Sequence, residues 1–276
     1  CKMVKFDKLT KIHKDYQKIA AASSGGVDSS VLTQAAHLAL GDKAIAVTAD
    51  SPLLQDNEKD DAVKVAKIVG IKHILMKSDD LAVPEIAAND KNRCYYCKKF
   101  RFTNMCNWAK ENGFNYIIEG SNLDDKTDYR PGMKAIAELS DMVKSPFLEA
   151  GIGKKEIRQI AHKYNLPVWN KPSQACLASR LAYGLSLTAD RLEQVDKAER
   201  LLRQYINGQI RVRHHGKLAR IEIMPEEFAK FSLPDFRTKI YNELKELGFT
   251  FITLDMNGYK MGSQNAAISQ IQNQPN

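Results

Sequence analysis

The chain has 276 residues, of which 43% are hydrophobic and 27% are charged, and it contains no low-complexity tract. This length and composition exclude a disordered or fibrous protein and allow one large and one smaller globular domain. The formal charge of +8 suits an anionic partner, such as a nucleotide, a phosphorylated small molecule or RNA, without choosing among them.

The amino-terminal sequence CKMVKFDKLTKIHK lacks the apolar stretch of a secretory signal. Nowhere does an apolar run approach the roughly 20 residues that a membrane-spanning helix needs. We therefore expect a cytoplasmic protein that does not associate with membranes. In that reducing compartment, cysteines are read first for metal binding or chemistry and only then for disulfides.

Short β-branched runs alternate with amphipathic stretches in the first half of the chain. They predict strands at residues 18–23, 44–50, 73–77 and 116–121, with helices between them that include residues 31–40 and 57–70. In the second helix we expect Val63, Ala66 and Val69 on one face and Gly70 at the end. The alternation implies an α/β fold, a parallel sheet with helices on both faces, which binds ligands beyond the carboxyl ends of its strands.

The segment SSGGVDSS, Ser23 to Ser30, falls at such an end, directly after the first strand. Gly25 and Gly26 allow a tight turn, so that the N–H groups of the helix start can hold an anion. A carboxylate repels bound phosphates unless a cation lies between, so we assign Asp28 to Mg²⁺. A glycine turn with a serine N-cap is the alternative, but it does not explain the whole string. We expect the anion and its Mg²⁺ to be held together by Ser24, Gly25, Gly26, Val27, Asp28, Ser29 and Ser30, with Asp28 on the cation.

The string SGGVDS in this strand–loop–helix context resembles the PP-loop of the ATP pyrophosphatases. That group includes GMP synthetase, NAD synthetase and tRNA-thiolating enzymes. The resemblance implies an adenine nucleotide α-hydrolase fold. It also implies that ATP is split between its α and β phosphates while a substrate oxygen is adenylylated.

A second polar segment, EGSNLDDKTDYRPG, follows the last predicted strand of this half and is expected at the same edge of the sheet. Ser121 and Asn122 can bond the polar groups of a nucleotide. Asp125 or Asp128 can share the Mg²⁺, and Arg130 can pair with a phosphate. A polar turn with aspartate caps is the alternative interpretation.

Cysteines form the least ordinary pattern in the sequence. Cys94 and Cys97 share one face if the segment CYYCKKFRFTNMCNWAKENG is helical, and Cys176 follows the predicted helix at residues 154–165. Structural zinc lacks a fourth ligand here, and a redox dithiol at the first pair leaves Cys176 unused. An iron–sulfur cluster held by three thiols, with its fourth iron open, uses all three. Cys106 is interpreted as a buried apolar residue.

Several further segments, in order, resemble the LarE family of ATP-dependent sulfur transferases, over roughly residues 5 to 265. They are DYRPGMKAIAE, KSPFLEAGIGKKEIRQIA, WNKPSQACLASRLAYG, IRVRHHGKLARIEI and FTFITLDMNGYKMGSQN. One branch of that family sacrifices the sulfur of a lone cysteine at the position of Cys176. Because Cys94 and Cys97 are also present, the chain resembles the other branch, whose three cysteines hold a 4Fe-4S cluster that carries a donor sulfide.

Arginines supply the cations that an anionic substrate needs. Arg211 and Arg213 alternate in the predicted strand IRVRHH, so they project to one face and can clamp a phosphate or a carboxylate. Arg180 lies four residues after Cys176, where it is expected to hold the activated group near sulfur, with Ser179 as its neighbour. A solvated strand face is the alternative for the two strand arginines.

The carboxyl-terminal part reads as a smaller α/β domain, so we expect one domain at residues 1–170 and another at 171–276. Strands are predicted at 209–214, 218–223 and 249–254, and helices at 188–206, with Thr188 as N-cap, and at 235–248. Apolar stripes of these helices are interpreted as core or subunit interface, and we expect a homo-oligomer. The stripes are Leu192, Val195, Leu202 and Tyr205, then Phe236, Ile240, Leu244 and Leu247.

The resemblance implies an enzyme that uses ATP, Mg²⁺ and a 4Fe-4S cluster to make a thiocarboxylate for the nickel-pincer cofactor of lactate racemase. Its substrate would be pyridinium-3,5-biscarboxylic acid mononucleotide, with sulfide or another sulfur donor as partner and no nucleic acid. Cys176, Asp28 and Arg180 are the expected catalytic residues. A tRNA thiolase is the alternative within the same superfamily, and a nucleotide sensor that does not split ATP is the non-enzymatic alternative.

Overall fold

The computed structural model describes residues 2–127, 131–172 and 174–263. The chain forms two compact units, and each is made from two stretches of sequence. The first unit contains Cys1–Asp80 and Cys94–Gln174, and the second contains Leu81–Arg93 and Ala175–Asn276. Among the described residues no helix is both long and apolar enough to span a bilayer.

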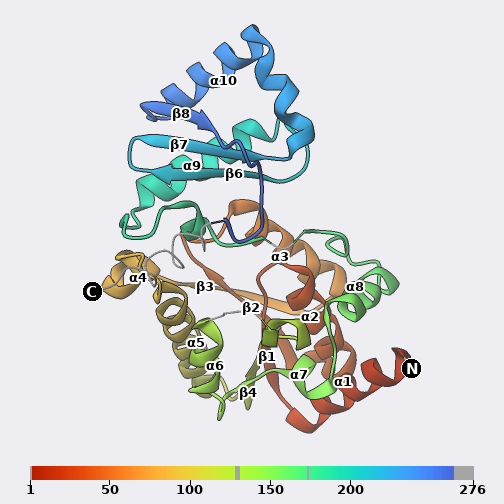
Figure 1. The fold of residues 1–276 in the computed structure, drawn as a ribbon. Helices are drawn as coiled ribbons and strands as arrows, with labels where there is room; N and C mark the ends of the chain where they lie inside the picture. Colours follow the sequence, from red (N-terminus) through yellow and green to blue (C-terminus); the bar gives the residue numbers. More distant parts are fainter. Residues whose placement is uncertain (1, 128–130, 173, 264–276) are drawn as a thin grey trace. The chain divides into compact units, whose positions relative to one another are not determined.

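A five-stranded sheet forms the centre of the first unit (Figure 1). Its order is β3-β2-β1-β4-β5, and every neighbouring pair is parallel. The strands are β1 (Ile19–Ala22), β2 (Ala44–Asp50), β3 (Lys72–Lys77), β4 (Tyr116–Ile118) and β5 (Val143–Lys144). The predicted parallel α/β fold is thus confirmed. The strand β5 is not among the predicted strands, because two residues are too short to show a periodic pattern.

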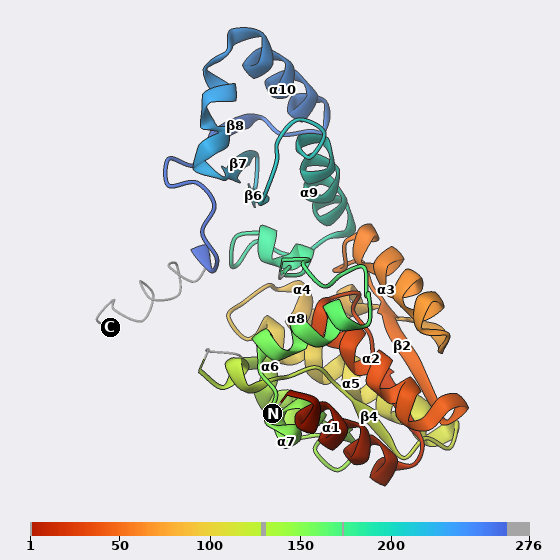
Figure 2. The ribbon, with the colours of Figure 1, turned by 90° about the vertical axis from the view of Figure 1, so that its right-hand side faces the viewer.

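Helices cover both faces of this sheet (Figures 1 and 2). One face packs against α1 (Lys2–Tyr16), α2 (Val27–Leu40), α3 (Asp56–Val69), α7 (Pro146–Ala150) and α8 (Lys154–Lys163). The other face packs against α5 (Arg93–Glu111) and α6 (Pro131–Ala137). Alternate residues of β1 point to opposite faces, so Ile19 and Ala21 join the first core while Ala20 joins the second.

The helix α3 corrects one predicted face. Ala66 and Val69 are buried as predicted, but the Val63 side chain is 42% exposed. The buried apolar positions are Ala62, Val65, Ala66 and Val69, at the spacing of 3 and 4 residues that keeps side chains on one side of a helix. Residues spaced only by steps of three, such as Val63, Ala66 and Val69, point in progressively different directions around the helix axis, so they do not all lie on one face. Gly70 ends the helix in the left-handed conformation, as predicted (φ 79°).

The second unit contains a three-stranded sheet of order β6-β7-β8, flanked by helices. β6 (Ile210–His215) and β7 (Leu218–Ile223) are antiparallel, whereas β7 and β8 (Phe251–Leu254) are parallel. Its helices are α4 (Pro84–Ala87), α9 (Ala189–Leu202) and α10 (Pro234–Glu246). Thr188 caps α9 by accepting a hydrogen bond from the backbone N–H of Arg191, as the sequence predicts.

Asn89 joins the two stretches that make up the second unit. Its side chain is fully buried and donates to the carbonyls of Ala182 (2.9 Å) and Leu185 (3.0 Å). Its own carbonyl accepts from Gly184 N (3.1 Å), and its φ is 55°, in the left-handed region. Buried carbonyls need donors, so this side chain satisfies a loop that would otherwise lose its hydrogen bonds.

Two substitutions of Asn89 separate the contribution of its side-chain hydrogen bonds from that of its left-handed backbone conformation. Asn89→Ala is expected to lower the free energy of unfolding by roughly 2–4 kcal/mol, because buried carbonyls lose their donors. Asn89→Gly is expected to cost about 1 kcal/mol less, since glycine accepts the positive φ. Urea denaturation followed by circular dichroism measures both. Equal costs for the two variants would contradict the role given to the backbone conformation.

Candidate functional site

The centre of the sheet is where its connections change direction. From β1 the chain continues to β2 and β3 on one side, and it later returns to β4 and β5 on the other. The loops after β1 and β4 therefore separate and leave a crevice at the carboxyl edge, the usual ligand site of such sheets. Those two loops carry the polar segments that start at Ser23 and Glu119.

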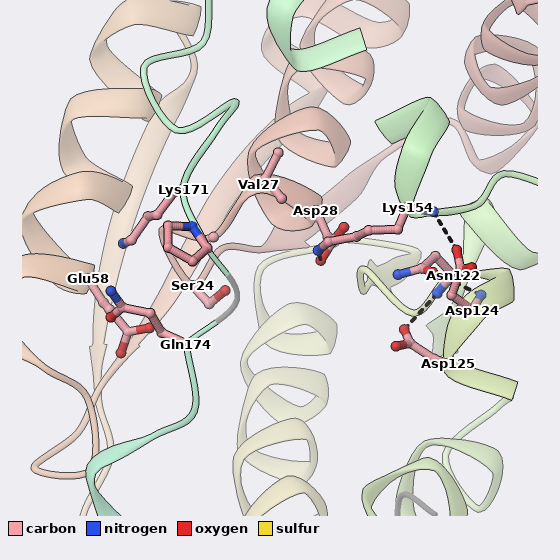
Figure 3. A pocket seen from close by; sticks show the side chains of 12 residues that line it. Ser24, Val27, Asp28, Glu58, Asn122, Asp124, Asp125, Lys154, Lys171 and Gln174 are labelled. Carbon is pink, nitrogen blue, oxygen red and sulfur yellow. Dashed lines mark hydrogen bonds and ion pairs between the residues drawn. The ribbon is translucent and has the colours of Figure 1, made fainter. Parts of the chain in front are cut away.

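A cavity of about 340 Å³ lies at this edge (Figure 3). Four of its lining residues come from the loop after β1 and the start of α2, and three come from the segment after β4. The lining residues are Ser24, Gly26, Val27, Asp28, Glu58, Asn122, Asp124, Asp125, Lys154, Lys171, Pro172 and Gln174. Of the predicted nucleotide-binding residues, Asp128 and Arg130 lie outside the described residues.

Gly25 brings the first loop against the start of α3. Its φ is +71°, and a Cβ placed on it would lie 2.1 Å from the backbone oxygen of Glu58. A side chain cannot fit there, so this position requires glycine. The hydroxyls of Ser29 and Ser30 both donate to the carbonyl of Gly26, at 3.1 and 2.8 Å, and thus close the first turn of α2.

Asp28, the predicted Mg²⁺ ligand, forms an ion pair with Lys154 through its Oδ2 atom. Its Oδ1 atom is buried and has no hydrogen-bond partner among the described residues. Burial raises the pKa of the Asp28 carboxyl above its usual value, and the nearby Lys154 ammonium partly opposes this shift. The carboxylate thus retains one oxygen that can coordinate a cation.

The segment after β4 brings further carboxylates beside Asp28. Asp125 accepts a hydrogen bond from Asn122 N (3.0 Å), and its charge raises the pKa of Asp28. Asp124 accepts from the backbone N–H of Lys154 (2.5 Å). Figure 3 shows Lys154 lying against Asp28 beside Asn122, Asp124 and Asp125.

The charges of this cavity fit a cation together with phosphates. Its described lining carries four carboxylates but only two ammonium groups, Lys154 and Lys171, and Lys171 pairs with Asp61 (2.7 Å). A polyphosphate without a metal ion would face a net negative wall. Within either unit taken by itself, the described side chains include no group of three or more His, Cys, Asp or Glu arranged to hold a metal. Asp28, with Asp125 beside it, would hold a Mg²⁺ ion that offsets the charge of the phosphates.

A second cavity of about 310 Å³ adjoins the first, because Ser24, Asp28 and Asp125 line both. One part of its wall is apolar, and another is formed by Cys97 and two cationic residues, Lys98 and Arg101. The apolar part consists of Ala22, Ala49, Leu54, Phe102 and Met105. This combination suits a flat apolar ring next to a charged group.

The four described cysteines lie in different environments. Cys94 is exposed on the first turn of α5, and Cys97 is half-buried with its Sγ 3.7 Å from Asp80 Oδ1. Asp80 is fully buried and is held by the Arg101 guanidinium at 2.7 Å. Cys106 is 5% exposed within the core, as predicted, and burial raises its pKa. Reactive or ligating roles therefore fit Cys94 and Cys97 but not Cys106.

Cys176 belongs to the second unit, where Arg180 holds its loop. The Arg180 side chain is fully buried, and its guanidinium donates to both carboxylate oxygens of Glu199, at 2.8 and 3.1 Å. Its Nη1 atom donates to the carbonyls of Ala175 and Cys176. These contacts hold the loop of the cysteine, and the role of Arg180 beside an activated substrate group stays a prediction.

The predicted anion clamp in β6 is buried. Arg211 and Arg213 are 4% and 5% exposed, so the alternative of a solvated strand face is wrong. Arg213 donates to the carbonyl of Ser179 and to Glu222, each at 2.8 Å, while its Nε has no hydrogen-bond partner among the described residues. Burial, and then the charge of Arg180, lowers the pKa of Arg211 to about 10.

The start of α5 is tied to the same loop. Arg93, the residue before Cys94, donates to the carbonyl of Ala178 at 3.0 Å and to the side chain of Asn89. Ala178 lies two residues after Cys176 in the short 3₁₀ helix Leu177–Arg180. The hydrogen bond from Arg93 to Ala178 thus lies within the second unit. Its donor directly precedes Cys94 in the sequence, and its acceptor lies in the loop of Cys176.

Several residues of the site are not among those that the sequence predicts. Lys154, Lys171 and Glu58 line the first cavity, and Asp80 and Glu199 anchor the arginines described above. Lys154 had one sequence signal, because it directly follows Gly153 at the start of a predicted helix, where N–H groups are free. Lys171 lies in the segment WNKPSQACLASRLAYG but is not among the residues that we predict from it, and Glu58, Asp80 and Glu199 belong to stretches with no local motif.

No family model matches the chain. A curated pyridinium-3,5-bisthiocarboxylic acid mononucleotide synthase of Lactiplantibacillus plantarum is 34% identical over 94% of this chain and 93% of its own length. An uncharacterized protein of Synechocystis sp. is 38% identical over 96% of this chain and 98% of its own length. A glutamine-hydrolysing GMP synthase of Oceanobacillus iheyensis is 26% identical over 69% of this chain and 40% of its own length.

The close approach at Gly25 predicts a large and local effect of substitution. Gly25→Ala is expected to lower the free energy of unfolding by roughly 2–4 kcal/mol, because the new Cβ displaces the start of α3. Gly151→Ala is the matched control, since Gly151 has the same φ of +71° but nothing within 4 Å of an added Cβ. It should cost only the backbone strain, about 1 kcal/mol. Similar losses for both variants in thermal unfolding would show that the contact with Glu58 is unimportant.

Proposed function

The chain belongs to the LarE family, and we propose that it adenylylates a carboxylate of pyridinium-3,5-biscarboxylic acid mononucleotide and then converts it to a thiocarboxylate. The family consists of ATP-dependent sulfur-transferring enzymes with a PP-loop α/β fold. The product would serve synthesis of the nickel-pincer cofactor of lactate racemase. Assembly into a homo-oligomer and a domain boundary at residue 170 stay predictions.

One observation carries the proposal. Cys97 and the loop residues Ser24 and Asp28 line a single cavity of the first unit. Activation by ATP and transfer of sulfur must act on the same carboxylate carbon, so the groups for both steps have to lie close together. A PP-loop enzyme without sulfur chemistry has no need of a thiol in this wall.

The two adjoining cavities divide the nucleotide between them in this proposal. The apolar wall with Phe102 and Met105 would hold adenine, and the cavity with Lys154 and Lys171 would hold the phosphates. Asn122 and Ser121 would bond the polar groups of the nucleotide. When bound, Mg²⁺ would screen the phosphates from Asp28.

Adenylylation follows from these positions. A carboxylate oxygen of the substrate attacks the α-phosphorus, the bond to the β-phosphate oxygen breaks, and pyrophosphate leaves. Negative charge then grows on pyrophosphate, where the ammonium groups of Lys154 and Lys171 and the N–H groups at the start of α2 would stabilise it. The resulting acyl adenylate carries AMP as a leaving group, so its carbonyl carbon can be attacked by a sulfur nucleophile.

We propose that Cys94, Cys97 and Cys176 hold the 4Fe-4S cluster. Their exposed or half-buried thiols fit this role, whereas Cys106 is enclosed by apolar residues. When bound, the cluster would supply a sulfide that can be replaced after each turnover. Within the second unit, Arg180 holds the backbone around Cys176, and Arg93 donates to the carbonyl of Ala178 in the same loop.

The substrate's own anionic groups would be bound in the second unit. Arg213 keeps an unpartnered Nε N–H among the described residues, and Arg211 lies over the ring of Tyr259, 5.0 Å from its centre. Ser179 lies beside them, with its hydroxyl donating to the carbonyl of Cys176 (2.7 Å). We propose that these three residues bind the phosphate of the mononucleotide.

Pyrophosphate release tests the function. The wild-type protein with ATP and Mg²⁺ should release pyrophosphate only when the dicarboxylate mononucleotide is added. Asp28→Asn should lower kcat/KM by about 100-fold through loss of charge stabilisation. Cys176→Ala is the control, because adenylylation precedes sulfur transfer: pyrophosphate should still be released but no thiocarboxylate formed. Nucleotide binding without any release would show a sensor, and steeply salt-dependent binding of bulk tRNA would favour a tRNA thiolase.

The ligand set is tested by removing one thiol at a time. After anaerobic reconstitution, Cys94→Ala, Cys97→Ala and Cys176→Ala should each lose the cluster, measured as iron, sulfide and visible absorbance. Cys106→Ala should keep a full cluster and lose only a little stability, since its thiol is in the core. A cluster that survives without Cys97, or is lost without Cys106, would show the assignment to be wrong.

A further inference from the structure

We propose that Lys154 is a catalytic residue with two positions: it occupies the cation site at Asp28 in the nucleotide-free protein, and it moves to the phosphates when ATP and Mg²⁺ bind. This inference rests on the proposed ATP site. In the nucleotide-free protein the ammonium of Lys154 forms an ion pair with Asp28, the carboxylate that we expect to bind Mg²⁺.

The backbone of Lys154 is held in place by hydrogen bonds, whereas its side chain is partly exposed. Lys154 is the first residue of α8, and its backbone N–H is held by Asp124 (2.5 Å). The preceding Gly153 N–H is held by Glu156 at 2.9 Å. The Lys154 and Asp28 side chains remain 28% and 27% exposed, so no core packing locks the pair. A flexible four-carbon chain on a fixed base can turn between two nearby anions.

The groups around the pair favour exchange once a nucleotide arrives. Asp125 adds negative charge next to Asp28, and the Asp28 Oδ1 atom has no hydrogen-bond partner among the described residues. A divalent cation satisfies adjacent carboxylates and phosphate oxygens better than one ammonium group can. Arg158 also acts on Asp28, but its guanidinium donates to the carbonyls of Trp169 and Lys171, at 2.9 Å each. Lys154 is therefore the cation placed to move.

This arrangement makes cation and nucleotide binding interdependent. Without nucleotide, the Lys154 ammonium lies against Asp28 and repels a divalent cation that approaches the free Oδ1 atom, so apparent affinity for the cation is reduced except in the fraction of molecules whose Lys154 has left. With nucleotide, the phosphates attract the ammonium and release Asp28. By linkage, the cation must then increase affinity for the nucleotide by the same factor. A merely structural ion pair would produce no such coupling.

Titration of Mn²⁺ followed by electron paramagnetic resonance tests the inference on the full chain, with and without α,β-methylene-ATP. Wild type should bind Mn²⁺ weakly alone and about tenfold more tightly with the analogue. Lys154→Met should bind Mn²⁺ about tenfold more tightly than wild type without the analogue, and should bind the analogue more weakly. Lys154→Arg, which keeps the charge and guards against an effect of unfolding, should resemble wild type without nucleotide.

The control variant is Lys155→Met, which removes the same charge from the exposed neighbouring position. It should leave the Mn²⁺ affinity of the nucleotide-free protein unchanged. Equal Mn²⁺ affinities for wild type and Lys154→Met, in the absence of nucleotide, would overturn the inference even if the analogue binds. Failure of wild type to bind the analogue at all would instead contradict the proposed ATP site.

Discussion

The central place of β1 in a parallel sheet controls the geometry of the candidate site. Because β2 lies on one side of β1 and β4 on the other, the loops that follow β1 and β4 diverge from neighbouring points on one edge. Gly25 then allows the first loop to touch the backbone of α3, which leaves Asp28 facing the segment of Asn122 and Asp125. The strand order therefore determines where the crevice forms, and the side chains of the two loops line it.

Electrostatics imposes the second condition on this site. The first cavity gathers more carboxylates than ammonium groups, although its proposed ligand is itself anionic. Such a wall is compatible with a polyphosphate only if cations enter with it or are rearranged within it. In the second unit the buried Arg180 and Arg213 are neutralised by Glu199 and Glu222, and among the described residues the Nε atom of Arg213 has no hydrogen-bond partner. Arg180 and Arg213 thus each have a carboxylate partner, as burial of a charge requires.

The cysteines show how environment separates chemistry from packing. Cys106 and Cys97 lie on the same helix, yet one is enclosed by the core while the other faces a cavity beside Asp80 and Arg101. Their spacing of nine residues, at 100° each, turns them to different sides of α5. Cys176 depends on a long-range ion pair instead, because Arg180 and Glu199 hold its loop from within the second unit.

The sequence by itself determined the parallel α/β fold, most of the strands, about half of the helices, the glycine loop before α2 and the burial of Cys106. These follow from local rules, namely the period of apolar residues and the freedom of glycine. The face of α3 was predicted only in part, since a pattern of apolar residues fits more than one helical stripe. Tertiary structure alone decided that Lys154 meets Asp28, that Glu199 takes the guanidinium of Arg180, and that Asn89 joins residues 81–93 to the second unit. Each of these contacts links side chains far apart in the chain, where no short-range preference records which partner folding will supply.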